Sequence, residues 1–120
     1  MTSYLILFPA DREDEWAVKT PEERQAVYDT DLEFGRLLEQ RDGMVTGGAE
    51  LDTCQRAHSI RRGPHGTALT TDGPYAESAE QLSGFYVVSI DDEQALLDAA
   101  QVLVKAHPAV EIRPIESQGD

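Results

Sequence analysis

Residues 84–90 read Gly-Phe-Tyr-Val-Val-Ser-Ile, and two aspartates follow them directly. Aromatic and β-branched residues fill this stretch, which predicts a β-strand. Asp91 and Asp92 both offer helix N-caps, and Gln94 is placed to close a capping box with Asp91. Apolar residues then recur at helical spacing until Pro108, which cannot continue a helix. This strand with its helix is the unit from which the rest of the fold extends.

The beginning of the chain predicts a second strand followed by a helix. Residues 4–8, Tyr-Leu-Ile-Leu-Phe, form an apolar run closed by Pro9, which is typical of a strand buried on both faces. Residues 20–23, Thr-Pro-Glu-Glu, supply a capping hydroxyl, a first-turn proline and a glutamate three residues after the cap. A helix is therefore expected from there to about Arg41.

Three further segments complete the predicted order. Residues 44–51 form a strand whose Gly47-Gly48 pair indicates a bulge or a close backbone approach, residues 56–71 form a hairpin, and residues 110–115 form an edge strand. Two strand–helix units of this kind place both helices on one face of an antiparallel or mixed sheet. We predict an α+β, ferredoxin-like βαββαβ fold with an inserted β-hairpin.

The length and composition of the chain limit its number of domains and its kinds of partner. The chain has 120 residues, 40% of them hydrophobic, which predicts a single domain over residues 1–116, with 117–120 as a flexible tail. The helices leave one face of the sheet bare, so a homodimer is expected to cover its apolar residues. A net charge of −13 argues against nucleic acid and membranes as partners.

Two local features qualify this picture. Arg56, Arg61 and Arg62 reverse the sign of the charge locally, either as a solvated hairpin or as an anion-binding rim. Cys54 is the single cysteine, so no intramolecular disulfide forms, and no segment is typical of a membrane span or a secretory signal. We expect a cytoplasmic protein.

Residues 71–77, Thr-Asp-Gly-Pro-Tyr-Ala-Glu, and residues 80–86, Glu-Gln-Leu-Ser-Gly-Phe-Tyr, resemble the signature of the YCII-related proteins in their DGPF branch. The resemblance implies a dimeric α+β barrel with a cleft at each sheet. In the plain YCII branch it also implies a His–Asp acid–base pair, whose histidine lies on the first helix. Asp31 stands in that region here, and Glu50 is displaced to the opposite sheet face from its family counterpart.

The predicted site consists of two acids. At 100° per residue, Asp31 falls about 40° from Val27, inside the apolar stripe of the first helix. If Asp72 faces it across a poorly hydrated cleft, the two acids share a proton, which supplies a donor beside an ionised base. Tyr75 is a second candidate donor. The alternatives are a solvated aspartate at 31 and an ordinary turn former at 72.

Three pairs of residues are further candidates for ligand binding. Gly73 and Pro74 shape the loop that carries Asp72, and Trp16 and Tyr28 either line the cleft or anchor the core or the dimer. Gly47 and Gly48 either lie beside the ligand or form a bulge. His58, His65 and His107 share no ligand spacing and are expected at the surface or in turns, so no metal site is predicted. No cofactor motif occurs either.

Two functions remain open. One is a small-molecule enzyme performing proton transfer in an isomerisation, elimination or hydrolysis, with Asp72 as the base and Asp31 or Tyr75 as the donor. The other is a non-catalytic small-molecule-binding or regulatory module that acts as a homodimer. The sequence names no substrate.

Overall fold

The computed structural model describes residues 2–9, 16–52, 54–73 and 82–116. The helices and strands follow the predicted order closely. They are β1 (Thr2–Pro9), α2 (Pro21–Glu39), β2 (Met44–Glu50), β3 (His58–Arg62), β4 (Ala68–Asp72), β5 (Leu82–Ile90), α3 (Glu93–Ala100) and β6 (Glu111–Pro114).

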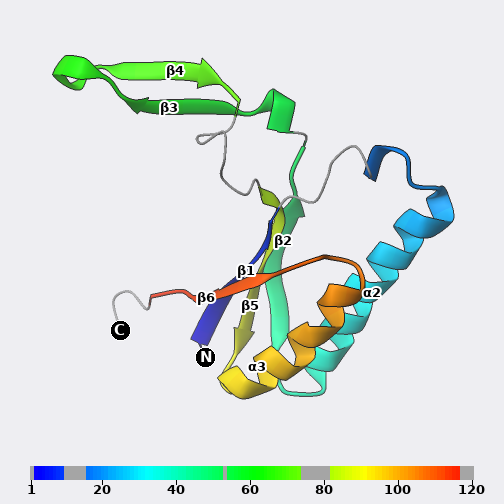
Figure 1. Cartoon of the computed structure of the whole chain (residues 1–120). Helices are drawn as coiled ribbons and strands as arrows, with labels where there is room; N and C mark the ends of the chain where they lie inside the picture. The colour runs from blue at the N-terminus through cyan, green and yellow to red at the C-terminus, as the bar shows by residue number, and fades with distance from the viewer. Residues whose placement is uncertain (1, 10–15, 53, 74–81, 117–120) are drawn as a thin grey trace.

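Four of the strands form one antiparallel sheet in the order β2-β5-β1-β6. Figure 1 shows α2 and α3 lying together on one side of this sheet. This arrangement confirms the α+β, ferredoxin-like prediction. The edge position predicted for the last strand is also confirmed, because β6 pairs only with β1 among the described strands.

Both helices begin at side-chain caps. Thr20 and Glu23 form the predicted capping box, with distances of 3.0 and 3.1 Å, and these hydrogen bonds lower the pKa of Glu23. At α3 the cap is Asp92, one of the two predicted N-caps, which accepts from the Ala95 amide at 3.2 Å. None of the described helices has the length and apolarity needed to cross a membrane.

The second helix is shorter than predicted. The α-helical part of α3 ends at Ala100, and the chain continues as a 3₁₀ helix over Gln101–Lys105. The amides of Ala106 and His107 then both donate to the Leu103 carbonyl, at 3.1 and 2.9 Å. This tightened end stops the helix ahead of Pro108 and directs His107 back toward the sheet.

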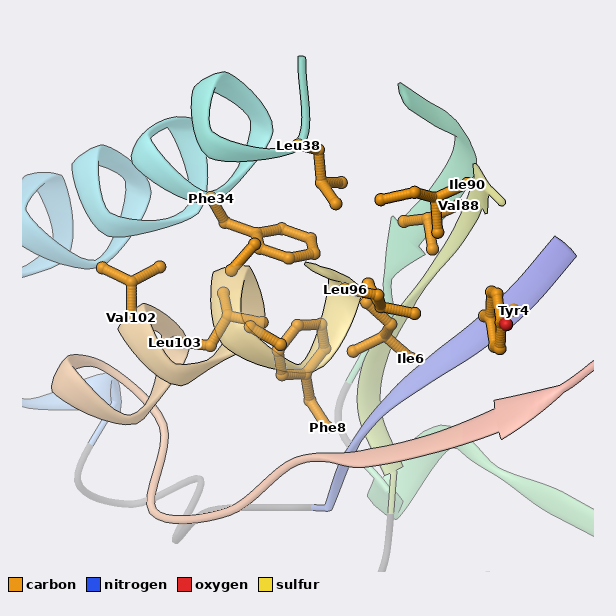
Figure 2. Packing of buried hydrophobic residues seen from close by; sticks show 12 residues of the cluster. Tyr4, Ile6, Phe8, Phe34, Leu38, Val88, Ile90, Leu96, Val102 and Leu103 are labelled. Atoms are coloured by element: carbon orange, nitrogen blue, oxygen red, sulfur yellow. The ribbon is translucent and has the colours of Figure 1, made fainter. Parts of the chain in front are cut away.

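The core lies between the sheet and the two helices. Figure 2 shows side chains of β1 and β5 pointing toward those of α2, α3 and the 3₁₀ helix that follows α3. Phe34 and Leu38 of α2 are fully buried there. The described core residues are Tyr4, Ile6, Phe8, Phe34, Leu38, Val88, Ile90, Leu96, Ala99, Ala100, Val102 and Leu103.

The other face of the sheet is not covered by any described element. Alternation along the strands places Leu5, Leu7, Phe85 and Val87 on this side, where all four are half-buried. Leu5 pairs with Val87 and Leu7 pairs with Phe85 across β1 and β5, so the four side chains adjoin. We call these four residues the open face. The prediction that β1 is buried on both faces is therefore wrong for the single chain.

The Gly47-Gly48 pair lies at a bulge, as predicted. The register of β2 against β5 shifts between Val45 and Gly47. Gly48 has a φ of +148°, and a Cβ atom there would lie 2.5 Å from the Phe85 carbonyl oxygen. Only glycine fits this backbone without strain, because other residues rarely adopt such a φ and have no room for a side chain.

The inserted hairpin is formed by β3 and β4, and we call residues 54–73 the arm. In Figure 1 the arm extends away from the four-stranded sheet. The radius of gyration of the chain is 16.7 Å, whereas a compact domain of this length has about 14 Å. We call the rest of the chain the body.

Candidate functional site

Asp31 lies on the inner side of α2, as its place in the apolar stripe predicts. It stands one turn before Phe34 and two turns before Leu38, both of which are fully buried. Its own side chain is only 19% exposed. A carboxylate in this position needs hydrogen-bond donors, because burying it unpaired is costly. Two other elements supply them.

The first donor is Tyr86 of β5. Its hydroxyl donates to Asp31 Oδ2 at 2.9 Å. The tyrosine ring contacts Phe8 edge-on at a centroid distance of 5.3 Å and stacks on Phe34 at 6.4 Å, which fixes its direction. Burial raises the pKa of Tyr86 far above its ordinary value, and the hydrogen bond to Asp31 and the charges of Asp31 and Glu50 raise it further. The phenol therefore stays protonated and remains a donor.

The second group is His107, which follows the 3₁₀ helix after α3. Its Nε2 lies 3.1 Å from Asp31 Oδ1, and its side chain is 14% exposed. The imidazole packs on the Phe8 ring at a centroid distance of 4.3 Å. With an ionised Asp31, Nε2 carries the hydrogen and donates it. The other ring nitrogen, Nδ1, has no hydrogen-bond partner among the described residues.

His107 was not predicted as a site residue, and its expected place at the surface or in a turn is wrong. A signal was present in the sequence, because His107 lies four residues after Leu103 and continues the buried side of the helical pattern. The resemblance had placed an imidazole on the first helix, where Asp31 stands instead. The structure brings the histidine to that aspartate from the opposite end of the chain.

The sheet beside Tyr86 is lined by glycines. Gly48 pairs with Tyr86 and Gly84 pairs with Phe8, so both glycines lie on the helix side of the sheet. A Cβ atom at Gly48 would lie 2.7 Å from Tyr86 Cδ1. Gly48 thus makes room for the tyrosine ring. Glu50, which pairs with Gly84, lies on the same side and adds negative charge near Tyr86.

Trp16 and Tyr28 lie together beside the first half of α2. Their rings meet edge-on at 5.9 Å, and the Arg24 guanidinium lies 5.2 Å from the centre of the Trp16 ring. Arg24 also donates to the Trp16 carbonyl at 3.0 Å. The contacts fit an anchor for the start of the helix, while Tyr28, 40% exposed and one turn before Asp31, is also available to a ligand.

Asp72 is not brought to Asp31. It ends β4 in the arm, its side chain is 94% exposed, and its carboxylate lies 3.2 Å from His58 Nδ1 on the neighbouring strand. The described partners of Asp31 are Tyr86 and His107 instead. The expected pair of acids sharing a proton is therefore wrong for the single chain, because β4 pairs with β3 and not with the main sheet.

The remaining candidates are only partly placed. Gly73 has a φ of +96°, donates to the Ala57 carbonyl at 2.7 Å and closes the base of the arm. Gly47 lies in the bulge of β2, where an added Cβ atom would meet no atom within 4 Å beyond its chain neighbours. Tyr75 and Pro74 lie outside the described residues. In the described part of the chain, no group of three or more His, Cys, Asp or Glu residues is arranged to hold a metal ion.

The Asp31–Tyr86–His107 cluster has the composition of an acid–base site. The carboxylate holds one imidazole nitrogen and orients the ring, and the phenol occupies its second oxygen. The free Nδ1 is then placed to accept or release a proton, which is the role of a general base or acid.

Comparison with known proteins agrees with this architecture. The sequence model of the family described as the YCII-related domain matches residues 2–117. A curated relative from Rhizobium meliloti (strain 1021), described as uncharacterized protein R00369, is 40% identical over 53 residues. That alignment covers 42% of this chain and 43% of the relative's length.

Proposed function

The chain belongs to the YCII-related family, and we propose that it is a small-molecule enzyme performing acid–base proton transfer at the Asp31–Tyr86–His107 cluster. One observation carries the proposal: a mostly buried carboxylate is bracketed by an imidazole at 3.1 Å and a phenol at 2.9 Å. Proton-transfer sites bring titratable groups together in a mostly buried position, where each holds the next in place, and this cluster has that arrangement.

Each residue has a separate role in this proposal. His107 is the general base or acid, acting through Nδ1. Asp31 fixes the tautomer and the direction of the imidazole by accepting from Nε2, and it stabilises the imidazolium that forms when the ring takes a proton. Tyr86 holds the second carboxylate oxygen, so that the carboxylate does not rotate away from His107.

The reaction class follows from these groups. An imidazole oriented by a carboxylate is suited to moving a proton next to a carbonyl group or to activating water. We therefore propose an isomerisation, an elimination or a hydrolysis of a small substrate. A catalytic role for Tyr75 stays a prediction, since Tyr75 lies outside the described residues. A catalytic role for Asp72 also stays a prediction, although Asp72 lies beside His58 and not beside Asp31 within one chain.

The proposal includes a homodimer of the DGPF branch, a dimeric α+β barrel. Its support is the open face, where Leu5, Leu7, Phe85 and Val87 form an apolar block that no described element covers. Burying this block against a second copy is favourable because about 25 cal/mol is gained for each Å² of apolar surface removed from water.

A second candidate is a non-catalytic module that binds or senses a small molecule. The observation that favours it is that both oxygens of Asp31 already have protein donors. Such a closed network also serves to fasten α2 and the end of α3 to the sheet. In this case His107 Nδ1 offers a hydrogen bond to the ligand and no proton is transferred.

The experiment compares the wild-type protein with His107→Gln. The glutamine amide reaches the place of Nε2 and keeps the bond to Asp31, while Nδ1 is removed. Proton transfer is followed by NMR as deuterium exchange into a panel of ketones and keto acids in D₂O, and hydrolysis by acid release from esters and lactones. His65→Gln, an exposed residue at the tip of the arm, is the control.

We expect turnover of at least one compound by the wild-type protein and by His65→Gln, and a loss of at least 100-fold in His107→Gln. Turnover that survives in His107→Gln refutes the proposed base. Compounds that raise the melting temperature equally in both proteins without being turned over support the binding module instead.

A further inference from the structure

Among the described residues, the arm has no contacts with the body comparable to the contacts inside it. In the described chain β3 and β4 pair with each other alone, as a separate two-stranded sheet. Figure 1 shows the arm extended beyond the main sheet, and the chain measures 52 × 46 × 19 Å along its principal axes. An isolated two-stranded hairpin is at best marginally stable in water. A partner that covers the arm would stabilise it.

The arm is nevertheless well defined by its own hydrogen bonds. At its base the Ser59 hydroxyl donates to the Gly73 carbonyl at 2.7 Å, and the Gly73 amide donates to the Ala57 carbonyl at 2.7 Å. At its tip the Gly63 amide donates to the Thr67 carbonyl at 2.6 Å. The arm therefore presents a fixed surface, which lowers the entropic cost of docking.

The two faces of the arm carry apolar side chains next to arginines. His58, Ile60 and Arg62 share one face, on which Ile60 is 70% exposed. Arg61 lies on the other face opposite Leu69, which is 42% exposed. A large aliphatic residue beside arginines is typical of a protein interface, where arginine is enriched, and less typical of a hairpin that remains in solvent.

The charges of the arm and the body are opposite. The arm contains three of the ten basic residues and one of the twenty-three acidic residues, Asp72, so the body carries seven basic residues against twenty-two acidic ones. Arg56 is paired with Asp52 at 2.7 Å. Neither Arg61 nor Arg62 has a carboxylate within ion-pair distance in the part of the chain that is described.

We propose that the arm of one chain docks on the acidic body of a second copy of the same chain, with Ile60 as the apolar anchor and Arg62, which shares its face, as the charged contact. Arg61, on the other face, adds to the positive charge of the arm. The acidic body of another copy has the charge opposite to that of the arm, so each chain supplies both halves of the proposed contact. The net charge of −13 opposes binding to nucleic acid or to an anionic membrane, and these are the weaker occupants. This contact is separate from the open face and does not depend on the proposed reaction.

The first test measures self-association by sedimentation equilibrium of the full chain. The arm variants are Ile60→Ser and the double variant Arg61→Glu/Arg62→Glu. The control is Arg36→Glu/Lys105→Glu, which changes the net charge equally at exposed positions of the body. Circular dichroism establishes that each variant is folded. We expect the dissociation constant to rise at least tenfold in the arm variants, and less than threefold in the control.

The second test locates the contact directly. A photoreactive phenylalanine analogue replaces Ile60, and unlabelled chains carrying it are mixed with ¹⁵N-labelled wild-type chains before irradiation. We expect a crosslink from position 60 to a body peptide of a ¹⁵N-labelled chain. The proposal is overturned if position 60 crosslinks within its own chain or not at all, or if the arm variants dissociate no more than the control. A short RNA probe that binds the wild-type protein but not Arg61→Glu/Arg62→Glu, with self-association unchanged, also overturns it.

Discussion

Replacing Asp31 by alanine removes the acceptor of two hydrogen bonds that join three elements of the fold. Tyr86 donates to one oxygen at 2.9 Å, and His107 lies 3.1 Å from the other. A hydrogen bond to a charged group contributes about 1.5–3 kcal/mol where water is excluded. Since the side chains of His107 and Asp31 remain 14% and 19% exposed, water replaces part of the loss. We expect Asp31→Ala to lower the free energy of unfolding by about 2 kcal/mol in total.

The matched control is Asp29→Ala on the same helix. Both variants replace an aspartate by the best helix former, so the change in helix propensity is the same. Asp29 accepts a single exposed bond from Gln25 at 2.9 Å, and an exposed i,i+4 pair of this kind contributes about 0.2–0.5 kcal/mol. Any additional loss in Asp31→Ala therefore reports the buried network.

The assay is urea unfolding followed by circular dichroism at one protein concentration, because the proposed association with a second chain would contribute to the apparent stability. With a slope of about 2 kcal/mol per molar, the midpoint of Asp31→Ala falls by about 1 M. Tyr86→Phe and the double variant complete a cycle, in which we expect a coupling of about 1 kcal/mol. Equal midpoints for Asp31→Ala and Asp29→Ala, or a coupling near zero, would refute the network.

Three further predictions test other parts of the structure. Burial raises the pKa of Tyr86, so the folded state keeps a proton that the unfolded state loses above pH 10, and stability is lost as the pH rises above that value. The melting temperature of Tyr86→Phe should therefore fall less steeply than that of the wild-type protein between pH 9 and 12. Equal slopes for the two proteins contradict this prediction. Val87→Asp on the open face should raise the dissociation constant of the proposed dimer at least 100-fold in sedimentation measurements. The control is Val104→Asp in the 3₁₀ helix after α3, where Val104 is 59% exposed, and it should leave the dissociation constant unchanged. Equal effects of the two variants exclude the open face as the interface. Gly48→Ala should destabilise the fold by about 2 kcal/mol in urea unfolding, because the added Cβ meets the Phe85 carbonyl oxygen at a φ of +148°. Gly35→Ala should stabilise the fold by about 0.5–1 kcal/mol, because Gly35 lies in a helix and its added Cβ meets no atom within 4 Å. The opposite order of the two variants contradicts the bulge geometry.

The fold was predictable because its signals are local. The Thr20 cap with Glu23, the Gly47-Gly48 bulge and the apolar run before Asp91 each determine a helix start, a strand irregularity or a strand without reference to distant residues. One error is also local in origin. The apolar spacing predicts an α-helix beyond Ala100, where the chain forms a 3₁₀ helix, because the spacing of the two forms is similar over one turn.

The sequence by itself determined the α+β fold, the order of its elements and the inward position of Asp31, since periodicity alone assigns a residue to one side of a helix. It did not determine the partners of that carboxylate. Tyr86 and His107 lie 55 and 76 residues away along the chain, and they meet Asp31 only after β5 pairs with β1 and the end of α3 packs under α2. The prediction that Asp72 faces Asp31 is wrong for the single chain for the same reason. Long-range hydrogen bonding decides which strand β4 pairs with, and no local sequence pattern determines that choice.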